Sequence, residues 1–116
     1  MSDTILIVDD EKNIRRTLRM ILEGEGFEVL EAGSAEEGLP LIDERAVDLV
    51  VLDVRLPGMT GVEFVRQVKH DPRFADVPVL LMSAYGDPAR HAADGFLAKP
   101  FDVENLTAEV QRLLCA

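Results

Sequence analysis

The sequence predicts an α/β fold, in which helices cover both faces of a doubly wound parallel sheet of five strands. Two observations carry this prediction. Short runs that are apolar throughout alternate with helical patterns along the 116 residues, and such runs are typical of strands buried on both faces. Five of them separated by helices indicate parallel strands joined by crossovers. A chain of this length suits one compact domain.

The first elements follow from the placement of apolar residues and glycines. Residues 5–8 form an apolar run that acidic residues stop, and this predicts a buried strand. A helix face follows, made by Ile14, Leu18, Ile21 and Leu22. Gly24 and Gly26 end this helix, because glycine is common just past a helix C-terminus. Residues 27–30 are the second predicted strand.

The second helix has a recognisable start signal. Ser34 followed three residues later by Glu37 is typical of a capping box, in which the two side chains cap backbone N–H groups. The apolar pattern continues to Ile42, and Pro40 lies inside it. Because proline has no backbone N–H, we expect one lost hydrogen bond and a kink at that point.

The second half of the chain repeats the alternation. Three further strands are predicted, at residues 49–52, 77–82 and 95–98. Helices are predicted by the apolar sets Val62, Phe64, Val65 and Val68, and Leu106, Val110, Leu113 and Leu114. Asp102 is the expected cap of the closing helix. Right-handed crossovers favour the flavodoxin-like strand order 2-1-3-4-5 for a sheet of this kind.

The link between the last two strands is too short for a full helix. Ser83 and Lys99 are 16 positions apart, and a predicted turn and the fifth strand take most of them. Residues 88–94 remain, which is about two helical turns at most. Alanines are the only apolar side chains that they offer, and so short a helix is marginal in water. We expect a shortened or irregular fourth helix, with His91 as an exposed polar residue.

Charge and composition exclude several classes of function. The net charge of −10 argues against direct binding of nucleic acid or of an anionic membrane, since both need a basic face. The single cysteine, Cys115, cannot form an intramolecular disulfide, which agrees with a reducing cytosol. The four apolar residues near the N-terminus are too few for a signal peptide or a membrane span. We therefore expect a cytoplasmic protein that binds neither membrane nor nucleic acid.

Polar residues stand where four of the predicted strands end. Asp9 and Asp10 follow the first strand, Asp53 the third, Ser83 the fourth and Lys99 the fifth. The carboxyl ends of parallel strands meet at one edge, and the switch point of this strand order lies between strands one and three. Any one of these residues alone is more often a cap, a turn hydroxyl or a solvated charge. As a set they predict one shallow pocket.

The pocket has the parts needed for phosphoryl transfer. Three neighbouring carboxylates repel one another unless a cation lies between them. Mg²⁺ is suited to such a site, since it binds through one or two carboxylates together with waters and phosphate. A lysine and a hydroxyl suit a tetrahedral anion, and a carboxylate can itself accept a phosphoryl group.

Four segments carry a family resemblance: residues 5–11, 51–61, 81–85 and 96–101. Together they resemble the receiver domains of response regulators in two-component signalling. The resemblance implies that Asp53 accepts the phosphoryl group and becomes 4-aspartylphosphate. It also implies that Mg²⁺ is held by Asp9, Asp10 and Asp53, together with the backbone carbonyl of Arg55.

The resemblance assigns further roles around the acceptor. It implies that Lys99 contacts the phosphoryl group and that Ser83 is a switch hydroxyl that turns toward it. Phe96 is similar to the aromatic residue whose position reports activation, and the bond between Lys99 and Pro100 is expected to be cis. The implied donor is a phosphohistidine on a sensor histidine kinase or a phosphotransfer protein.

The same resemblance predicts the extent of the domain, its activity and the surface through which it signals. Residues 1–116 are expected to form a single receiver domain, with an unknown downstream effector and no catalysis beyond its own phosphorylation and dephosphorylation. Family members often signal through the face built from helix four, strand five and helix five, so a curtailed helix predicts output through another face. Arg55 and Tyr85 flank the predicted pocket, and we expect them to set the dephosphorylation rate by screening the attacking water.

Three other functions compete with this interpretation. A phosphatase of the haloacid-dehalogenase type needs a second aspartate two residues after the nucleophile, where this chain has Arg55. A flavin-binding protein needs a phosphate-cradling loop after the first strand, where residues 9–11 are acidic and would repel phosphate. A receiver-fold interaction module that works without phosphorylation stays open, because the fourth helix is curtailed.

Overall fold

Strands and helices alternate along most of the chain. The structure, a computed structural model, describes residues 3–86 and 92–115. The elements are β1 Thr4–Val8, α1 Lys12–Gly24, β2 Glu28–Ala32, α2 Ala35–Glu44, β3 Leu49–Asp53, α3 Gly61–His70, β4 Val79–Ser83, β5 Gly95–Ala98 and α4 Val103–Leu114. No helix in these two ranges is long and apolar enough to cross a membrane.

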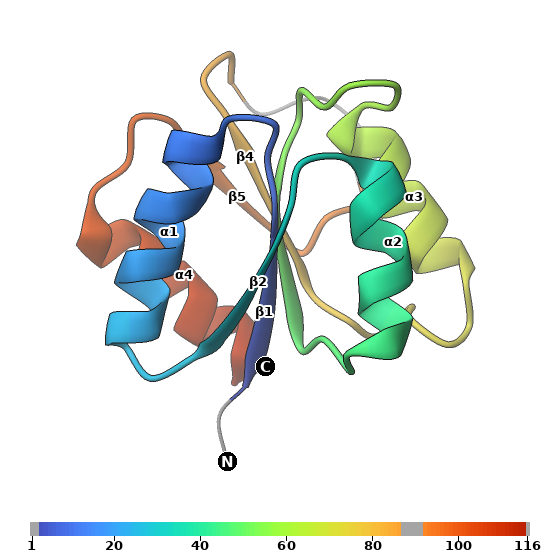
Figure 1. Ribbon diagram of the computed structural model, residues 1–116, viewed down its shortest axis with the longest axis horizontal. Helices are drawn as coiled ribbons and strands as arrows, with labels where there is room; N and C mark the ends of the chain where they lie inside the picture. The colour runs from blue at the N-terminus through green and yellow to red at the C-terminus, as the bar shows by residue number, and fades with distance from the viewer. Residues whose placement is uncertain (1–2, 87–91, 116) are drawn as a thin grey trace.

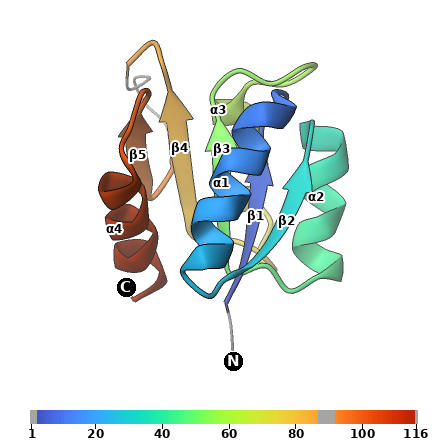
Figure 2. The same cartoon turned by 60° about the vertical axis from the view of Figure 1, so that its left-hand side comes forward.

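The five strands form one parallel sheet with the order β2-β1-β3-β4-β5, as predicted (Figure 2). The register places the ends of neighbouring strands level to within one residue. Val8 pairs with both Ala32 and Leu52, and Ser83 pairs with Ala98. The residues that follow the strands therefore gather at one edge of the sheet.

Two layers of helices cover the sheet, α1 and α4 on one face and α2 and α3 on the other (Figure 1). Because successive residues of a strand point to opposite faces, each apolar strand supplies both layers of the core. Ile5 and Ile7 pack with α1 and α4, while Leu6 and Val8 pack with α2 and α3. All four side chains are fully buried, and each contributes about 1.5–3 kcal/mol to folding.

The predicted helix starts are confirmed, with one change in detail. Ser34 Oγ accepts a hydrogen bond from the Glu37 N–H at 3.2 Å. Glu37 Oε2 accepts a hydrogen bond from the N–H of Gly33, at 3.2 Å, and not from that of Ser34. Asp102 caps α4 through the N–H of Asn105 at 2.7 Å, and α2 runs through Pro40 without ending there.

Two predicted strand starts are displaced in the structure. Phe27 lies outside β2, since its N–H donates to the carbonyl of Leu22 and closes the end of α1. Gly26, with a φ of 94°, provides the left-handed turn before it. Val77 lies in a turn before β4, where its N–H donates to the carbonyl of Phe74.

The link between β4 and β5 has no room for a full helix. Residues 84–86 and 92–94 are not helical, which leaves the five residues 87–91, whereas three helical turns need about 11. The sequence predicted a shortened or irregular helix in this link, before the closing helix α4, and that expectation is confirmed to that extent. The conformation of residues 87–91, His91 among them, lies outside the described residues. Asp94 then begins the return, with its carboxylate 2.8 Å from both the Val79 N–H and Lys69 Nζ.

Candidate functional site

The strand ends bring together the residues that the sequence singled out. The N–H of Asp9 extends the ladder of β1 and β2 by bonding the Ala32 carbonyl at 3.1 Å. Asp53 is the last residue of β3 and Ser83 the last of β4. The N–H of Lys99 bonds the carbonyl of Ser83 at 2.9 Å, which extends the ladder of β4 and β5. The backbone of the sheet therefore fixes the starting point of each side chain.

Lys99 joins two of the acidic residues. Its Nζ lies 2.5 Å from Asp53 Oδ2 and 3.3 Å from Asp9 Oδ2. Asp9 has no exposed side-chain surface, while Lys99 and Asp53 are 15% and 12% exposed. Burial of this kind makes the ion contacts strong, because little water is left to screen them.

Burial and the neighbouring charges shift the pKa values of Asp9 and Lys99. Burial raises the pKa of the Asp9 carboxyl above its ordinary value, against the opposing effects of the Glu11 N–H and the Lys99 charge. Burial by itself would lower the pKa of Lys99, but the hydrogen bond to Asp53 and the two carboxylate charges outweigh it and raise that pKa. Lys99 is therefore held in its charged form.

The Asp53 carboxylate is held at both oxygens. Oδ1 accepts a hydrogen bond from the N–H of Arg55 at 2.9 Å, and Oδ2 accepts from Lys99. The start of α3 packs directly against this residue: a Cβ placed on Gly61 would lie 2.5 Å from the Asp53 carbonyl oxygen and 2.8 Å from Val54 Cα. Only glycine permits this approach. Asp53 is thus fixed in place with its side chain open to a cleft.

A group of three oxygen donors lies beside it. The carboxylates of Asp9, Asp10 and Glu11 can bring one oxygen each within 4.8 Å of one another, and the last two are exposed. Glu11 was not among the predicted metal ligands, although the acidic run that contains it was visible in the sequence. A neighbouring cleft of about 360 Å³ is lined by Asp10, Glu11, Ile14, Asp53, Arg55, Ala84, Tyr85 and Lys99. Hard oxygen donors around a space of this size fit Mg²⁺.

Ser83 and Phe96 lie on the neighbouring strands. Ser83 is 3% exposed, and its Oγ accepts a hydrogen bond from the N–H of Tyr85 at 3.0 Å. Phe96 is partly buried against the core layer of α2 and α3 and pairs with Leu81. Because Leu81 stands two residues before Ser83 on the same strand, the hydroxyl and the aromatic ring share one region of the sheet.

Arg55 and Tyr85 stack over the cleft. The guanidinium carbon of Arg55 lies 3.9 Å from the centroid of the Tyr85 ring, within the range of a cation–π contact. Tyr85 is 73% exposed, and both residues line the cleft beside Asp53. The bond between Lys99 and Pro100 is cis, as the family resemblance implied.

Comparison with known proteins gives a consistent result. A family model described as the response regulator receiver domain matches residues 5–111. The chain is 37% identical to the phosphate regulon transcriptional regulatory protein PhoB of Pseudomonas aeruginosa, over 96% of this chain and 51% of that protein. It spans about half the length of the curated relatives it matches.

Solved structures with a similar fold cover nearly the whole chain. The chemotaxis response regulator CheY4 of Vibrio cholerae matches with a TM-score of 0.90 and 31% identity, over 97% of this chain and 99% of that one. The response regulator TrrA of Thermotoga maritima, in complex with Mg²⁺ and BeF, matches with a TM-score of 0.87 and 35% identity, over 96% of this chain and 98% of that one.

Proposed function

We propose, from the premise that this chain belongs to the response regulator receiver domain family, that Asp53 is the phosphorylation site of a two-component signalling switch. Receiver domains are signalling modules. The observation that carries the assignment is the contact of 2.5 Å between Lys99 Nζ and Asp53 Oδ2, at the edge of the acidic cleft. Among the described residues, Asp53 is the carboxylate that both lines this cleft and bonds the lysine.

The proposed reaction is a transfer from phosphohistidine to carboxylate. One Asp53 oxygen attacks the phosphorus and a P–O bond forms. The P–N bond of the donor breaks with its electron pair left on the ring nitrogen, and the imidazole is released neutral because its other nitrogen already carries a proton. The charge that builds on the phosphoryl oxygens is the main obstacle, so catalysis consists of positioning and neutralisation. Lys99 supplies one positive charge and is already aimed at the acceptor oxygen.

Mg²⁺ is the cofactor that the site suits. Asp9, Asp10 and Asp53 would hold it together with the Arg55 carbonyl, and Glu11 adds an exposed carboxylate beside them. When bound, the ion would neutralise the acidic pocket and the incoming phosphoryl oxygens. TrrA, which this chain resembles, was solved with Mg²⁺ and BeF, which supports the proposal.

The proposed output begins at Ser83. Its hydroxyl now accepts the Tyr85 N–H, and a phosphoryl group on Asp53 offers it a charge-assisted hydrogen bond instead. A rotation toward that group opens space on the side of Phe96, and this couples the site to β4 and β5. A sensor histidine kinase or a phosphotransfer protein is the proposed donor, the cytoplasm the proposed location, and residues 1–116 one receiver domain.

Phosphorylation by a small phosphodonor tests this function. Acetyl phosphate with Mg²⁺ should add one phosphoryl group to the protein, measured by intact mass, and removal of Mg²⁺ with a chelator should stop the reaction. Asp53→Asn keeps the shape of the side chain and should abolish labelling, whereas Asp102→Asn, an exposed helix cap, should not. Equal labelling of the Asp53→Asn variant would contradict the assignment.

A further inference from the structure

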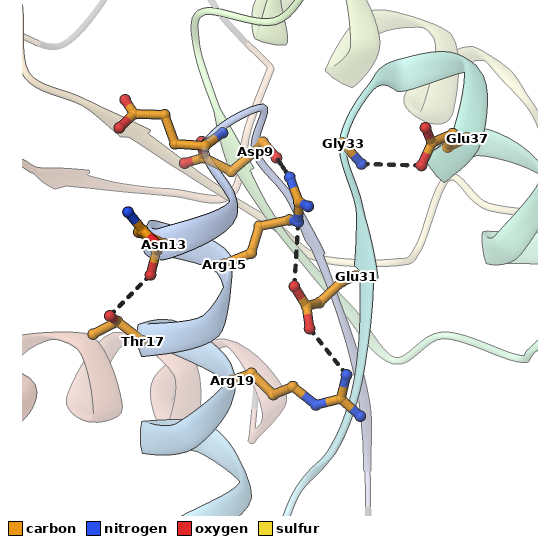
Figure 3. Close-up of polar contacts among 9 residues, drawn as sticks. Asp9, Asn13, Arg15, Thr17, Arg19, Glu31, Gly33 and Glu37 are labelled. Carbon is orange, nitrogen blue, oxygen red and sulfur yellow. Dashed lines mark hydrogen bonds and ion pairs between the residues drawn. The ribbon is translucent and has the colours of Figure 1, made fainter.

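Arg15 occupies an unusual place at the corner where the chain leaves β1 and enters α1 (Figure 3). Its Nη1 donates to the backbone carbonyl of Asp9 at 2.6 Å, and its Nε donates to Glu31 Oε1 on β2 at 3.2 Å. The side chain is only 17% exposed. One guanidinium therefore joins the end of β1, the first turns of α1 and the neighbouring strand.

The far end of this contact is itself held in place. Glu31 Oε2 accepts from Arg19 Nη1 at 2.9 Å (Figure 3). Arg19 Nε also donates to Glu23 Oε2 at 3.1 Å. Burial alone would raise the pKa of Glu31, but the hydrogen bonds from the two arginines outweigh it and lower that pKa. Glu31 is thus a charged anchor that fixes the Arg15 guanidinium.

The backbone that Arg15 binds, at Asp9, is part of the acidic site. The N–H of Asp9 bonds Ala32, and its two carboxylate oxygens accept from the Glu11 N–H at 2.9 Å and from Lys99. The Asp9 carbonyl is the remaining polar group of this buried residue, and it is the group that Arg15 binds. Asp10 and Glu11 follow directly, so the orientation of this one peptide sets where their carboxylates lie.

We propose that Arg15, anchored by Glu31, is a positioning residue for the metal site: it fixes the Asp9 backbone so that the acidic carboxylates are set for the cation. This inference rests on the proposed function, because it concerns how the same site binds Mg²⁺. Partners that orient metal ligands from outside are often as important as the ligands, and their removal costs about 10- to 100-fold in metal affinity.

The sign of the change in Mg²⁺ affinity separates a positioning role of Arg15 from an effect of its positive charge alone. Removing a positive charge near a cation site should tighten cation binding. Removing a positioning contact should weaken it. The two effects have opposite signs, so the direction of the change decides between them.

Mg²⁺ affinity measured by isothermal titration calorimetry on the folded chain tests the proposal. Arg15→Gln should bind Mg²⁺ about 10- to 100-fold more weakly than the wild type. Arg16→Gln is the matched control, since it removes the same charge from the next, exposed residue, and its affinity should be equal to or tighter than that of the wild type. In the metal-free protein, the Glu11 amide should exchange its hydrogen faster in Arg15→Gln than in Arg16→Gln.

A second variant tests the anchor separately. Glu31→Gln keeps Arg15 but weakens its fixation, so it should lower the Mg²⁺ affinity in the same direction and by less. The double variant should bind no more weakly than Arg15→Gln alone, because both changes act through one contact. Should Arg15→Gln fail to fold, Arg15→Lys decides in its place, because it keeps the positive charge but cannot make both guanidinium contacts: weaker Mg²⁺ binding supports the positioning role, and unchanged binding contradicts it.

The outcomes distinguish this inference from the proposed function. Mg²⁺ affinities of Arg15→Gln and Arg16→Gln that agree within twofold would overturn the positioning role and leave the proposed function standing. An unchanged affinity in a folded Glu31→Gln protein would overturn the anchor. A wild-type chain that binds no Mg²⁺ would overturn both the proposed function and this inference.

Discussion

Lys99 Nζ lies 2.5 Å from Asp53 Oδ2, although the two residues are 46 positions apart in the sequence. The contact joins the end of β3 to the residue that follows β5, across the intervening strand β4. In the proposed reaction, the lysine is therefore in place before the phosphoryl group arrives. This arrangement saves the cost of ordering a long side chain during the reaction.

Loss of this lysine should slow phosphorylation without abolishing metal binding. Lys99→Ala removes a charged donor aimed at the reacting oxygen, and such a loss typically costs about 100-fold in rate. The rate of phosphorylation by acetyl phosphate, followed by intact mass, is the measurement, with Arg66→Ala on the exposed surface of α3 as the control. A Lys99→Ala rate within threefold of the control would contradict the assigned role.

Truncation of Ser83 should uncouple the site from the aromatic switch. Ser83→Ala removes the acceptor of the Tyr85 N–H and should lower stability by about 1 kcal/mol. In NMR spectra, the phosphorylation-dependent shift of the Phe96 amide should shrink, and Ser83→Thr, which keeps a hydroxyl, should preserve it. A full Phe96 shift in Ser83→Ala would show that the signal leaves Asp53 by another path.

The stack of Arg55 on Tyr85 should lengthen the lifetime of the phosphorylated state. The guanidinium carbon of Arg55 lies 3.9 Å from the centroid of the Tyr85 ring, and both residues line the cleft that contains Asp53. Tyr85→Ala should accelerate loss of the phosphoryl group several-fold, whereas Tyr85→Phe keeps the ring and should have a lifetime near that of the wild type. The lifetime is measured after the phosphodonor is removed, and equal lifetimes in both variants would exclude a screening role.

The close packing of Gly61 gives a prediction about stability. A Cβ there would meet backbone atoms of β3 at 2.5 Å and 2.8 Å, so Gly61→Ala should lower the free energy of unfolding by about 1–3 kcal/mol. Gly24→Ala is the control, because a Cβ there meets nothing within 4 Å. It should leave stability unchanged or raise it by about 0.5–1 kcal/mol. Urea denaturation measures both, and similar values for the two variants would contradict the packing argument.

Much of the fold could be predicted because local patterns and the global sheet agree. The apolar runs of β1 and β3 are buried on both faces, as uninterrupted runs of that kind predict. The starts of β2 and β4 were harder to predict, because Phe27 and Val77 are apolar, yet their N–H groups donate to turn carbonyls and not to a neighbouring strand. Strand boundaries depend on such hydrogen bonds, which composition does not reveal.

The candidate site could also be predicted in part from the sequence. Asp9, Asp53 and Lys99 could be predicted to meet, because they follow or end strands of one parallel sheet, whose carboxyl ends lie at the same edge. The role of Arg15 could not be predicted, since its contact with the Asp9 carbonyl depends on the path of the backbone and on an anchor 16 positions away, Glu31. From the sequence alone, an arginine on a helix face is expected to be a solvated charge.

Chemical trapping of the phosphorylated residue tests the central claim most directly. The protein is phosphorylated with acetyl phosphate and Mg²⁺ and reduced with borohydride, which converts an aspartyl phosphate into homoserine, and its peptides are then sequenced by mass spectrometry. We predict homoserine at position 53, dependent on both phosphodonor and Mg²⁺. Homoserine at Asp9 or Asp10 with an unchanged Asp53 would contradict the assignment, and so would a phosphorylated protein in which no carboxylate is reduced.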